Sequence, residues 1–503
     1  MSERPPALPA TLPELDAPEA TPRTLLVLTG LGAAFDLTVN GQRPGVSITF
    51  FTLLFALALR TVAPRSRETD VLLGGAVVLS IFPALRATVP LVALNVLGAS
   101  ALLALAATGE FGSITKLSFT GLFPRALAFL ERALHVPRFL MAPLTAPADR
   151  RRSRVILRTA LIVTPILALF ASLLASGDRV FARLLQSFLP EWNVSNLLSH
   201  VALTLLGIVL VAIVWRTALG NGTTAQPKDA PERDPILGFS EWATLLIGID
   251  VLFAAFVVVQ FAYLFGGHHR VSVTKGLSYA EYARSGFFQL AAAAALAVLV
   301  ILATWDAGRR DHPGHERWFR GLVTAMVGLT GVVLASAVTR LALYEGTFGF
   351  TTDRFIGYVA IVAIGAILLV LLGAIWWSRR ANVVAGFLAV AFLALLTINV
   401  MNPERFVAER NVARFEATGK IDVDYLGSVL GNDAVPILTP LLSRLNGPDA
   451  TRLHLALCIR AELLSPEPSW RSANLGRSSA RTALEGAGIT PATCSNAFPH
   501  SLR

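Results

Sequence analysis

The sequence predicts an all-α, multi-pass membrane protein: a bundle of about eleven transmembrane helices followed by a small extracytoplasmic helical domain. Of its 503 residues, 54% are hydrophobic and only 15% are charged, whereas about a quarter of the residues in soluble proteins are charged. The hydrophobic residues come in long blocks, many of them close to the roughly 20 residues with which a helix crosses a bilayer. The Lys and Arg residues behind the net charge of +10 lie mainly between these blocks. There they set orientation, so the basic charge does not indicate nucleic-acid binding.

The chain divides into three predicted parts. Residues 1–23 form a disordered tail rich in Pro and Ala, without an apolar core, so the first helix is expected to act as an uncleaved targeting signal. Residues 24–400 form the helix bundle, with a flexible polar loop at 217–234. Residues 401–503 form the C-terminal domain. The predicted spans are Thr24–Val39, Ser47–Val62, Val71–Leu85, Val89–Ala107, Val155–Ala175, Leu197–Trp215, Leu237–Phe265, Gly286–Trp305, Leu322–Tyr344, Phe355–Trp377 and Val383–Val400.

The segment 110–147 differs from the spans because its apolar residues recur at helical spacing while basic residues occupy the other faces. This pattern predicts an amphipathic helix lying on the inner, anionic leaflet of the membrane. A cytoplasmic helix packed on the bundle is the alternative.

The charged loops predict the orientation. With the N-terminus inside, the inner loops hold about twenty Lys and Arg residues and the outer loops fewer than ten, as the positive-inside rule requires. An odd number of spans then places the C-terminal residues outside. Four short helical patterns occur there: Glu404–Ala417, Val423–Leu430, Ala434–Leu445 and Thr451–Leu464. They predict a small helical domain with a looser end.

Cys458 and Cys494 are the two cysteines of the chain. If the C-terminal domain lies outside the cytoplasm, they can pair in an oxidising space, and the closed loop would contribute roughly 3–4 kcal/mol. Two unpaired thiols are the alternative.

The motifs of soluble enzymes do not fit their required context. Ser113–Lys116 and Ser272–Lys275 match the Ser-x-x-Lys pattern, but neither comes with the other motifs of that enzyme class, so chance explains them. The histidine pairs, His268-His269 and His312 with His315, supply too few ligands for a metal site. We therefore predict no metal site and no cofactor.

Polar residues inside the spans are better candidates for function because burying them in lipid costs free energy unless they face protein or water. Asp250 lies near the middle of its span, with Gln260 nearer the outer end of the same helix, and Asn95 lies inside an earlier span. Asp250 is the strongest candidate for a proton- or ion-coupling carboxylate. The alternative is a structural carboxyl group, protonated or hydrogen-bonded between helices.

A second set of polar residues is predicted to lie near the outer membrane surface. Its arginines could hold an anionic headgroup or substrate, because the guanidinium group suits phosphate and carboxylate. The alternative is ion pairing between helices and snorkelling at the interface. The set comprises Asp36, Arg86, Glu281, Arg284, Arg340, Glu345, Asp353 and Arg354.

Several stretches resemble one family. They are Leu237-Gly-Phe-Ser-Glu-Trp-Ala, Phe-Val-Val-Val-Gln260-Phe-Ala-Tyr-Leu-Phe-Gly-Gly267, Tyr279-Ala-Glu-Tyr-Ala-Arg-Ser-Gly-Phe-Phe-Gln289 and, in the tail, Asn402-Pro, Asp422-Val-Asp-Tyr-Leu426, Asp433-Ala-Val-Pro436 and Trp470-Arg-Ser472. The chain resembles, from Leu25 to about Leu484, the bacterial multi-pass membrane family catalogued as domain of unknown function 4173, which is related to 4153. The resemblance implies a protein of the bacterial cytoplasmic membrane. It implies no activity and carries over no catalytic residue.

The leading hypothesis is a non-enzymatic, transporter-like or sensory membrane component, whose C-terminal domain docks a protein partner. The alternative is an envelope enzyme that acts on a lipid-linked or anionic substrate at the outer leaflet, with Asp36, Glu281 or Asp353 as acid or base. A passive assembly factor is a third reading. The expected partners are the lipid bilayer, including anionic lipid, and a protein; nucleic acid is not expected.

Overall fold

The computed structural model describes residues 20–109, 113, 119–145, 163, 167, 170, 174, 197–220, 236–265, 287–377, 382–465 and 469–497. Across these ranges the regular structure is helical, and the one β-type contact is an isolated parallel bridge between Leu237 and Gly308. Eight helices in the described ranges are long and apolar enough to cross a membrane. The chain is therefore an all-helical, multi-pass membrane protein in the part that the structure describes.

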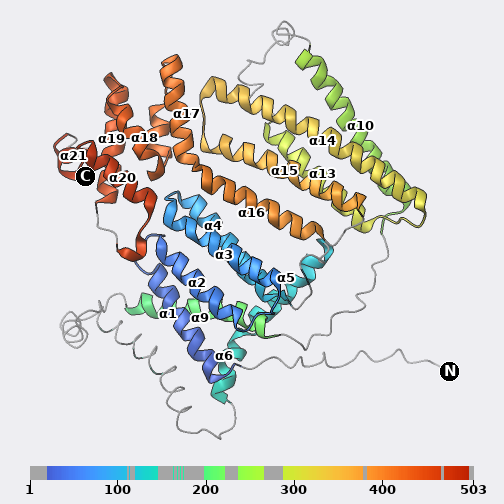
Figure 1. Cartoon of the computed structure of the whole chain (residues 1–503), viewed down its shortest axis with the longest axis horizontal. Helices are drawn as coiled ribbons and strands as arrows, with labels where there is room; N and C mark the ends of the chain where they lie inside the picture. The colour runs from blue at the N-terminus through green and yellow to red at the C-terminus, as the bar shows by residue number, and fades with distance from the viewer. Residues whose placement is uncertain are drawn as a thin grey trace.

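Two bundles of helices make up the membrane part (Figure 1). The first packs its buried Leu, Ala and Phe side chains around Leu28, Leu59 and Leu79. Its main helices are α1 (Pro22–Val39), α2 (Val46–Arg60), α3 (Arg67–Leu85), α4 (Val89–Ala107) and α9 (Leu197–Leu219).

The second bundle packs around Trp242, Ile301 and Met326, which are fully buried. Its helices are α10 (Phe239–Phe265), α13 (Phe287–Ala307), α14 (Pro313–Phe348) and α15 (Thr352–Trp376). Helix α16 (Val383–Met401) runs between the bundles, beside α15 on one side and α4 on the other (Figure 1).

Local sequence explains where the spans begin. The hydroxyl oxygen of Ser66 accepts a hydrogen bond from the backbone N–H of Thr69 at the start of α3, and Thr351 caps α15 in the same way through Arg354. Such caps satisfy N–H groups that the first turn of a helix leaves without partners. Asp70 in the first turn of α3 and Asp353 in that of α15 add favourable charge at the helix N-terminus.

Some elements differ from the expectation. Helix α14 has 36 residues, about 54 Å at 1.5 Å per residue, and so extends well beyond the predicted span Leu322–Tyr344. Its added first turns are polar and contain an i,i+4 ion pair between Glu316 and Arg320, 3.0 Å apart, which supports helix outside lipid.

Other predictions are matched in part or fall outside the described residues. The predicted spans Thr24–Val39 and Ser47–Val62 correspond to α1 and α2, which are not among the eight membrane-length helices; α2 is an apolar helix of 15 residues. The amphipathic segment 110–147 contains α5 (Phe119–Leu134) and α6 (Val136–Thr145). The predicted span Val155–Ala175, apart from four residues, lies outside the described residues, as do the loop 217–234 apart from its first four residues and the N-terminal tail 1–19.

The C-terminal helices, residues 403–465 and 469–497, share a buried hydrophobic cluster with the start of α15. They comprise α17 (Pro403–Thr418), α18 (Val435–Leu442), α19 (Gly447–Leu464), α20 (Leu475–Gly486) and α21 (Pro491–Ala497), with short π or 3-10 turns at Tyr425–Val429, Asn432–Ala434 and Trp470–Ser472. Helices α20 and α21 occupy the region where a looser end was expected.

A sharp turn leads from the membrane into the C-terminal helices. Asn402 adopts the left-handed conformation, with φ of 51°, and its side-chain oxygen accepts a hydrogen bond from the backbone N–H of Arg405. Asparagine tolerates this conformation better than most residues. Pro403 follows at the first position of α17, where its fixed φ suits a helix start.

The C-terminal helices lie across one end of both bundles (Figure 1). At the first bundle, the backbone N–H of Val46 donates to Ala473 O over 3.0 Å. At the second, Asn411 Nδ2 donates to Phe350 O over 2.8 Å and the N–H of Thr352 donates to the Tyr425 hydroxyl over 2.9 Å. The α1–α2, α3–α4 and α14–α15 connections therefore lie at the same end of the molecule.

Candidate functional site

A set of buried and half-buried polar side chains lies where the α3–α4 connection, the end of α16 and the C-terminal helices meet. We call this set the junction. Its members are Arg86, Asn95, Asn399, Glu404, Asp433, Arg460, Asn474 and Arg477. Three parts of the chain that are far apart in sequence come together here, so the junction determines how the C-terminal helices sit on the membrane bundles.

Asn95 and Asn399 form a reciprocal pair between α4 and α16. Each side-chain Nδ2 donates to the other residue's Oδ1 over 2.8 Å, and each also donates to the carbonyl oxygen four residues earlier on its own helix. Both residues are fully buried. The pair satisfies two amides that would otherwise be unpaired within the spans.

Arg86 and Asn474 connect backbone groups across the junction. Arg86 Nε donates to Asn399 O over 2.7 Å, just after α3 ends. Asn474 Nδ2 donates to Pro83 O over 2.9 Å and to Arg86 O over 2.8 Å. Pro83 lies in the last turn of α3 and Arg86 is its C-cap, where the helix leaves carbonyl groups without helical partners. The side chain of Asn474 thus fixes the start of α20 against the end of α3.

Two buried carboxyl groups, those of Glu404 and Asp433, lie at the centre of the junction, with exposed fractions of 4% and 5%. Glu404 Oε2 accepts from the backbone N–H of Asp433 over 3.3 Å, and Asp433 Oδ2 accepts from the N–H of Ala87 over 3.3 Å. A Cβ added at Gly431 would overlap the Glu404 carboxylate, and one added at Gly476 would overlap Asp433 Oδ1. Both carboxyl groups are therefore packed directly against backbone.

The junction changes the acidity of these carboxyl groups. Burial raises the pKa of Asp433 to about 6, and the neighbouring Glu404 carboxyl acts in the same direction. Burial also raises the pKa of Glu404, against the opposing effect of the Arg460 guanidinium. Within the described residues, no group of three His, Cys, Asp or Glu side chains could hold a metal ion.

Asp250 lies inside the second bundle, 9% exposed, on the face of α10 that also buries Leu246 and packs Phe253 against the core. Neither of its carboxylate oxygens has a hydrogen-bond partner among the described residues. Gln260, on the same helix, differs because its Oε1 accepts a hydrogen bond from the Ser336 hydroxyl of α14 over 3.0 Å. Asp250 is thus a buried ionisable group to which the described part of the chain offers no hydrogen-bond partner, within Phe239–Gln260, one of the eight segments long and apolar enough to cross a membrane.

The residues predicted to lie at the outer surface have separate partners. Asp36 Oδ2 is 2.7 Å from His200 Nδ1, and its Oδ1 accepts from Asn40 Nδ2 over 3.0 Å. Arg354 donates to Gly349 O, and its guanidinium carbon lies 4.0 Å from the centre of the Tyr344 ring.

The other described members of this set that belong to the second bundle lie on α14 and α15. Arg340 lies on α14, and Asp353 is exposed in the first turn of α15. Glu345 Oε2 accepts from the Tyr358 hydroxyl over 3.1 Å. Glu281 and Arg284 lie outside the described residues.

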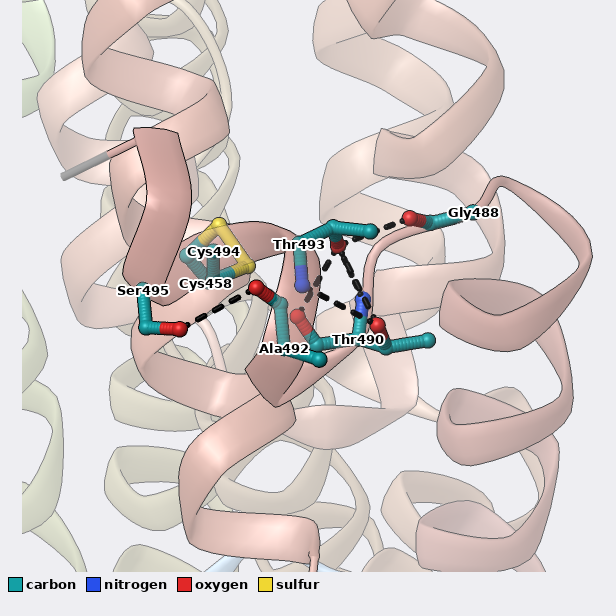
Figure 2. The surroundings of a disulfide bond; sticks show 7 residues. All are labelled: Cys458, Gly488, Thr490, Ala492, Thr493, Cys494 and Ser495. Carbon is teal, nitrogen blue, oxygen red and sulfur yellow. Dashed lines mark hydrogen bonds between the residues drawn. A yellow bond between two sulfur atoms is a disulfide. The ribbon is translucent and has the colours of Figure 1, made fainter.

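Cys458 and Cys494 form a disulfide that joins α19 to α21 (Figure 2). The turn before α21 is closed by hydrogen bonds of Thr490 and Thr493, in which each side-chain oxygen accepts from the backbone N–H of the other residue. The closed loop spans 36 residues, for which the loss of entropy in the unfolded chain corresponds to about 4 kcal/mol.

Sequence reasoning missed most of the junction. Asn399 carries the same signal that identified Asn95, a polar residue inside an apolar run. Glu404 and Asp433 lie in a polar, charged tail, where nothing in the spacing separates a buried acid from an exposed one. His200, the partner of Asp36, stands at the start of a span and was not singled out.

A family model described as Domain of unknown function (DUF4153) matches residues 73–441. The matched range runs from α3 to α18, and so it includes both carboxyl groups of the junction as well as Asp250. Searches of curated proteins and of solved structures found no match to the chain. The match is thus to the related family 4153, and a match to family 4173 is not found. The chain belongs to the family of the domain of unknown function DUF4153.

Proposed function

We propose that this protein is a non-enzymatic, transporter-like membrane component in which Asp250 takes up and releases a proton. The observation that carries the proposal is the Asp250 carboxylate, buried in the second bundle with neither oxygen hydrogen-bonded among the described residues. Burying an unpaired charge in such surroundings costs several kcal/mol of free energy. Ionisable residues are kept inside membrane spans mainly where they serve proton relays, ion pathways or counter-ions.

The surroundings of Asp250 support a carboxyl group that alternates between two states. Its helix, α10, packs mainly against α14. Ten residues along α10, about 15 Å, Gln260 and Ser336 form a hydrogen bond between the same two helices. A movement of α10 against α14 would change the environment of Asp250, and so couple proton binding to helix position.

Proton flux into vesicles tests the proposal. The full chain is reconstituted into liposomes that contain a pH-sensitive dye, and a potassium diffusion potential drives protons inward. We expect flux above that of empty liposomes, and its loss in Asp250→Asn. Glu241→Gln is the matched control, because Glu241 is an exposed carboxylate on the same helix that caps Gly238. Equal flux in wild type and Asp250→Asn, or no flux above empty liposomes, would refute the proposal.

A sensory role is the second candidate, and the contacts of the C-terminal helices with both bundles favour it. These helices hydrogen-bond to the first bundle through Ala473 and Asn474 and to the second through Asn411 and Tyr425. A signal received by the C-terminal helices could therefore change the relative position of the bundles. In this proposal the C-terminal helices lie outside the bacterial cytoplasmic membrane, the N-terminus lies inside, and a protein partner docks on the C-terminal helices.

A matched measurement separates the two candidates. In a sensory component, cross-linking α20 to α3, which lie in contact, changes the accessibility of sites at the opposite ends of the spans, whereas Asp250→Asn does not. In a transporter, Asp250→Asn removes the proton flux while the attachment of the C-terminal helices stays intact.

A further inference from the structure

The short segment Ser469–Leu475 crosses the ends of three helices of the first bundle, α1, α2 and α3. Arg471 Nη1 donates to Leu37 O at the end of α1 over 3.0 Å. Ala473 O accepts from the first residue of α2, and Asn474 donates to the last turn of α3. The segment is therefore fixed against the ends of these three helices, at one end of the first bundle.

Trp470 in this segment points away from the protein core. Its side chain is 68% exposed, although its ring packs edge-to-face on Phe50 with centroids 6.2 Å apart. Phe50 lies one turn into α2 and begins a stripe of exposed apolar side chains that continues with Leu54 and Leu57. A stripe of this kind on an apolar membrane helix faces lipid. Trp470 thus extends the lipid-facing surface of α2 onto the C-terminal helices.

The level of Trp470 matches a known preference of its side chain. Tryptophan is enriched in the headgroup zone of bilayers, where its ring is in apolar surroundings and its N–H remains hydrated. Leu475, at the start of α20, is also 58% exposed at this end of the molecule.

Two arginines at this end of the molecule, Arg471 next to Trp470 in the chain and Arg43 in the α1–α2 connection, form no ion pair among the described residues. Arg43 donates to Leu463 O and Arg471 donates to Leu37 O, each over 3.0 Å. A guanidinium group has five N–H donors, so each arginine keeps donors that can bind a lipid phosphate. Basic residues beside an inserted aromatic ring favour anionic lipid.

We propose that Ser469–Leu475 is a membrane-interface anchor: Trp470 lies in the headgroup zone of the bilayer, and Arg43 and Arg471 bind lipid phosphates beside it. The occupant of this surface is lipid. The anchor holds the C-terminal helices against the membrane in addition to their contacts with the bundles.

Tryptophan quenching tests the position of Trp470. The full chain is reconstituted into vesicles of phosphatidylcholine and phosphatidylglycerol, and the fluorescence difference between wild type and Trp470→Phe isolates this ring. We expect lipids brominated near the headgroup to quench this component at least twofold more than aqueous iodide does. Stronger quenching by iodide would overturn the proposal. It would show that the ring faces water, as expected for a surface that binds a protein partner.

Photo-cross-linking gives an independent measurement. A benzophenone amino acid replaces Trp470 or, as matched control, Glu485, an exposed residue about 15 Å further along α20 than Leu475. We expect at least fivefold more lipid adduct at position 470, and a severalfold decrease there when Arg43→Gln and Arg471→Gln are combined. Equal adduct at the two positions would overturn the anchor, and adduct unaffected by the double substitution would overturn the phosphate contacts.

Discussion

Replacing Asp433 by asparagine should stabilise the attachment of the C-terminal helices at neutral pH. Burial raises the pKa of Asp433 to about 6, from an ordinary value of 3.8. The folded protein therefore holds this proton more tightly than the unfolded chain does. The stabilisation from Asp433 is fully present below about pH 4, decreases as the pH rises, and is lost above about pH 6.

The size of the effect follows from these two values. The difference between about 6 and 3.8 corresponds to about 3 kcal/mol. Asp433 is only 5% exposed, so solvent screens it little. Asparagine keeps an oxygen that can accept from the N–H of Ala87 but carries no charge to bury. We therefore expect Asp433→Asn to gain up to about 3 kcal/mol at neutral pH and to lose the part of the pH dependence between about pH 4 and pH 6 that Asp433 contributes.

Hydrogen exchange of the α17 and α20 amides measures this quantity, because it reports the free energy of local opening. Rates are corrected for the intrinsic effect of pH. Glu485→Gln, at an exposed site on α20, is the control and should change protection by less than about 0.5 kcal/mol. Lower protection in Asp433→Asn at neutral pH would refute the reasoning, because Arg86 and Arg477 would then stabilise the charge more than burial penalises it.

Three further predictions concern the packing of single residues. Asn95→Leu should lower the thermal stability of the purified protein by about 1 kcal/mol because it leaves the buried Oδ1 of Asn399 without its donor, and adding Asn399→Leu should recover at least half of the loss. Cys458→Ser should destabilise the C-terminal helices by about 4 kcal/mol in a chemical denaturation series, and an unchanged midpoint would exclude a stabilising disulfide. Gly476→Ala should cost about 2 kcal/mol in the same series because its Cβ meets a buried carboxylate. Gly486→Ala, where nothing lies within 4 Å of the new carbon, should cost nothing.

The prediction of spans from the sequence succeeded where helix formation depends only on the segment itself. In lipid every backbone polar group must be satisfied within the segment, so a long apolar run can only be a helix. Runs such as Val89–Ala107 and the core of Leu237–Phe265 therefore coincide with α4 and α10 to within two residues. The same logic identified Asp250, because a charge in an apolar run is visible without knowledge of its neighbours.

The ends of helices were harder to predict, since they depend on residues outside lipid. The charged composition of Pro313–Arg320 predicts a loop. In the structure this segment forms the first turns of α14, supported by the Glu316–Arg320 ion pair and by packing against the bundle. In the C-terminal tail, Leu475–Gly486 belongs to the predicted looser end, but it forms α20. The sequence does not indicate this helix because its apolar residues are few and their burial depends on α18 and α19.

The sequence by itself determined the class of protein, most of the membrane helices and one buried carboxylate within them, since the bilayer imposes these on each segment separately. The tertiary structure alone decided the junction. Asn95 and Asn399, which bond each other, are 304 residues apart in the sequence. Asp433 and Ala87, whose backbone N–H donates to the Asp433 carboxylate, are 346 residues apart. Whether an acid in a polar tail is exposed or buried depends on which distant backbone covers it. Only the docking of the C-terminal helices on α3 and α16 supplies that cover.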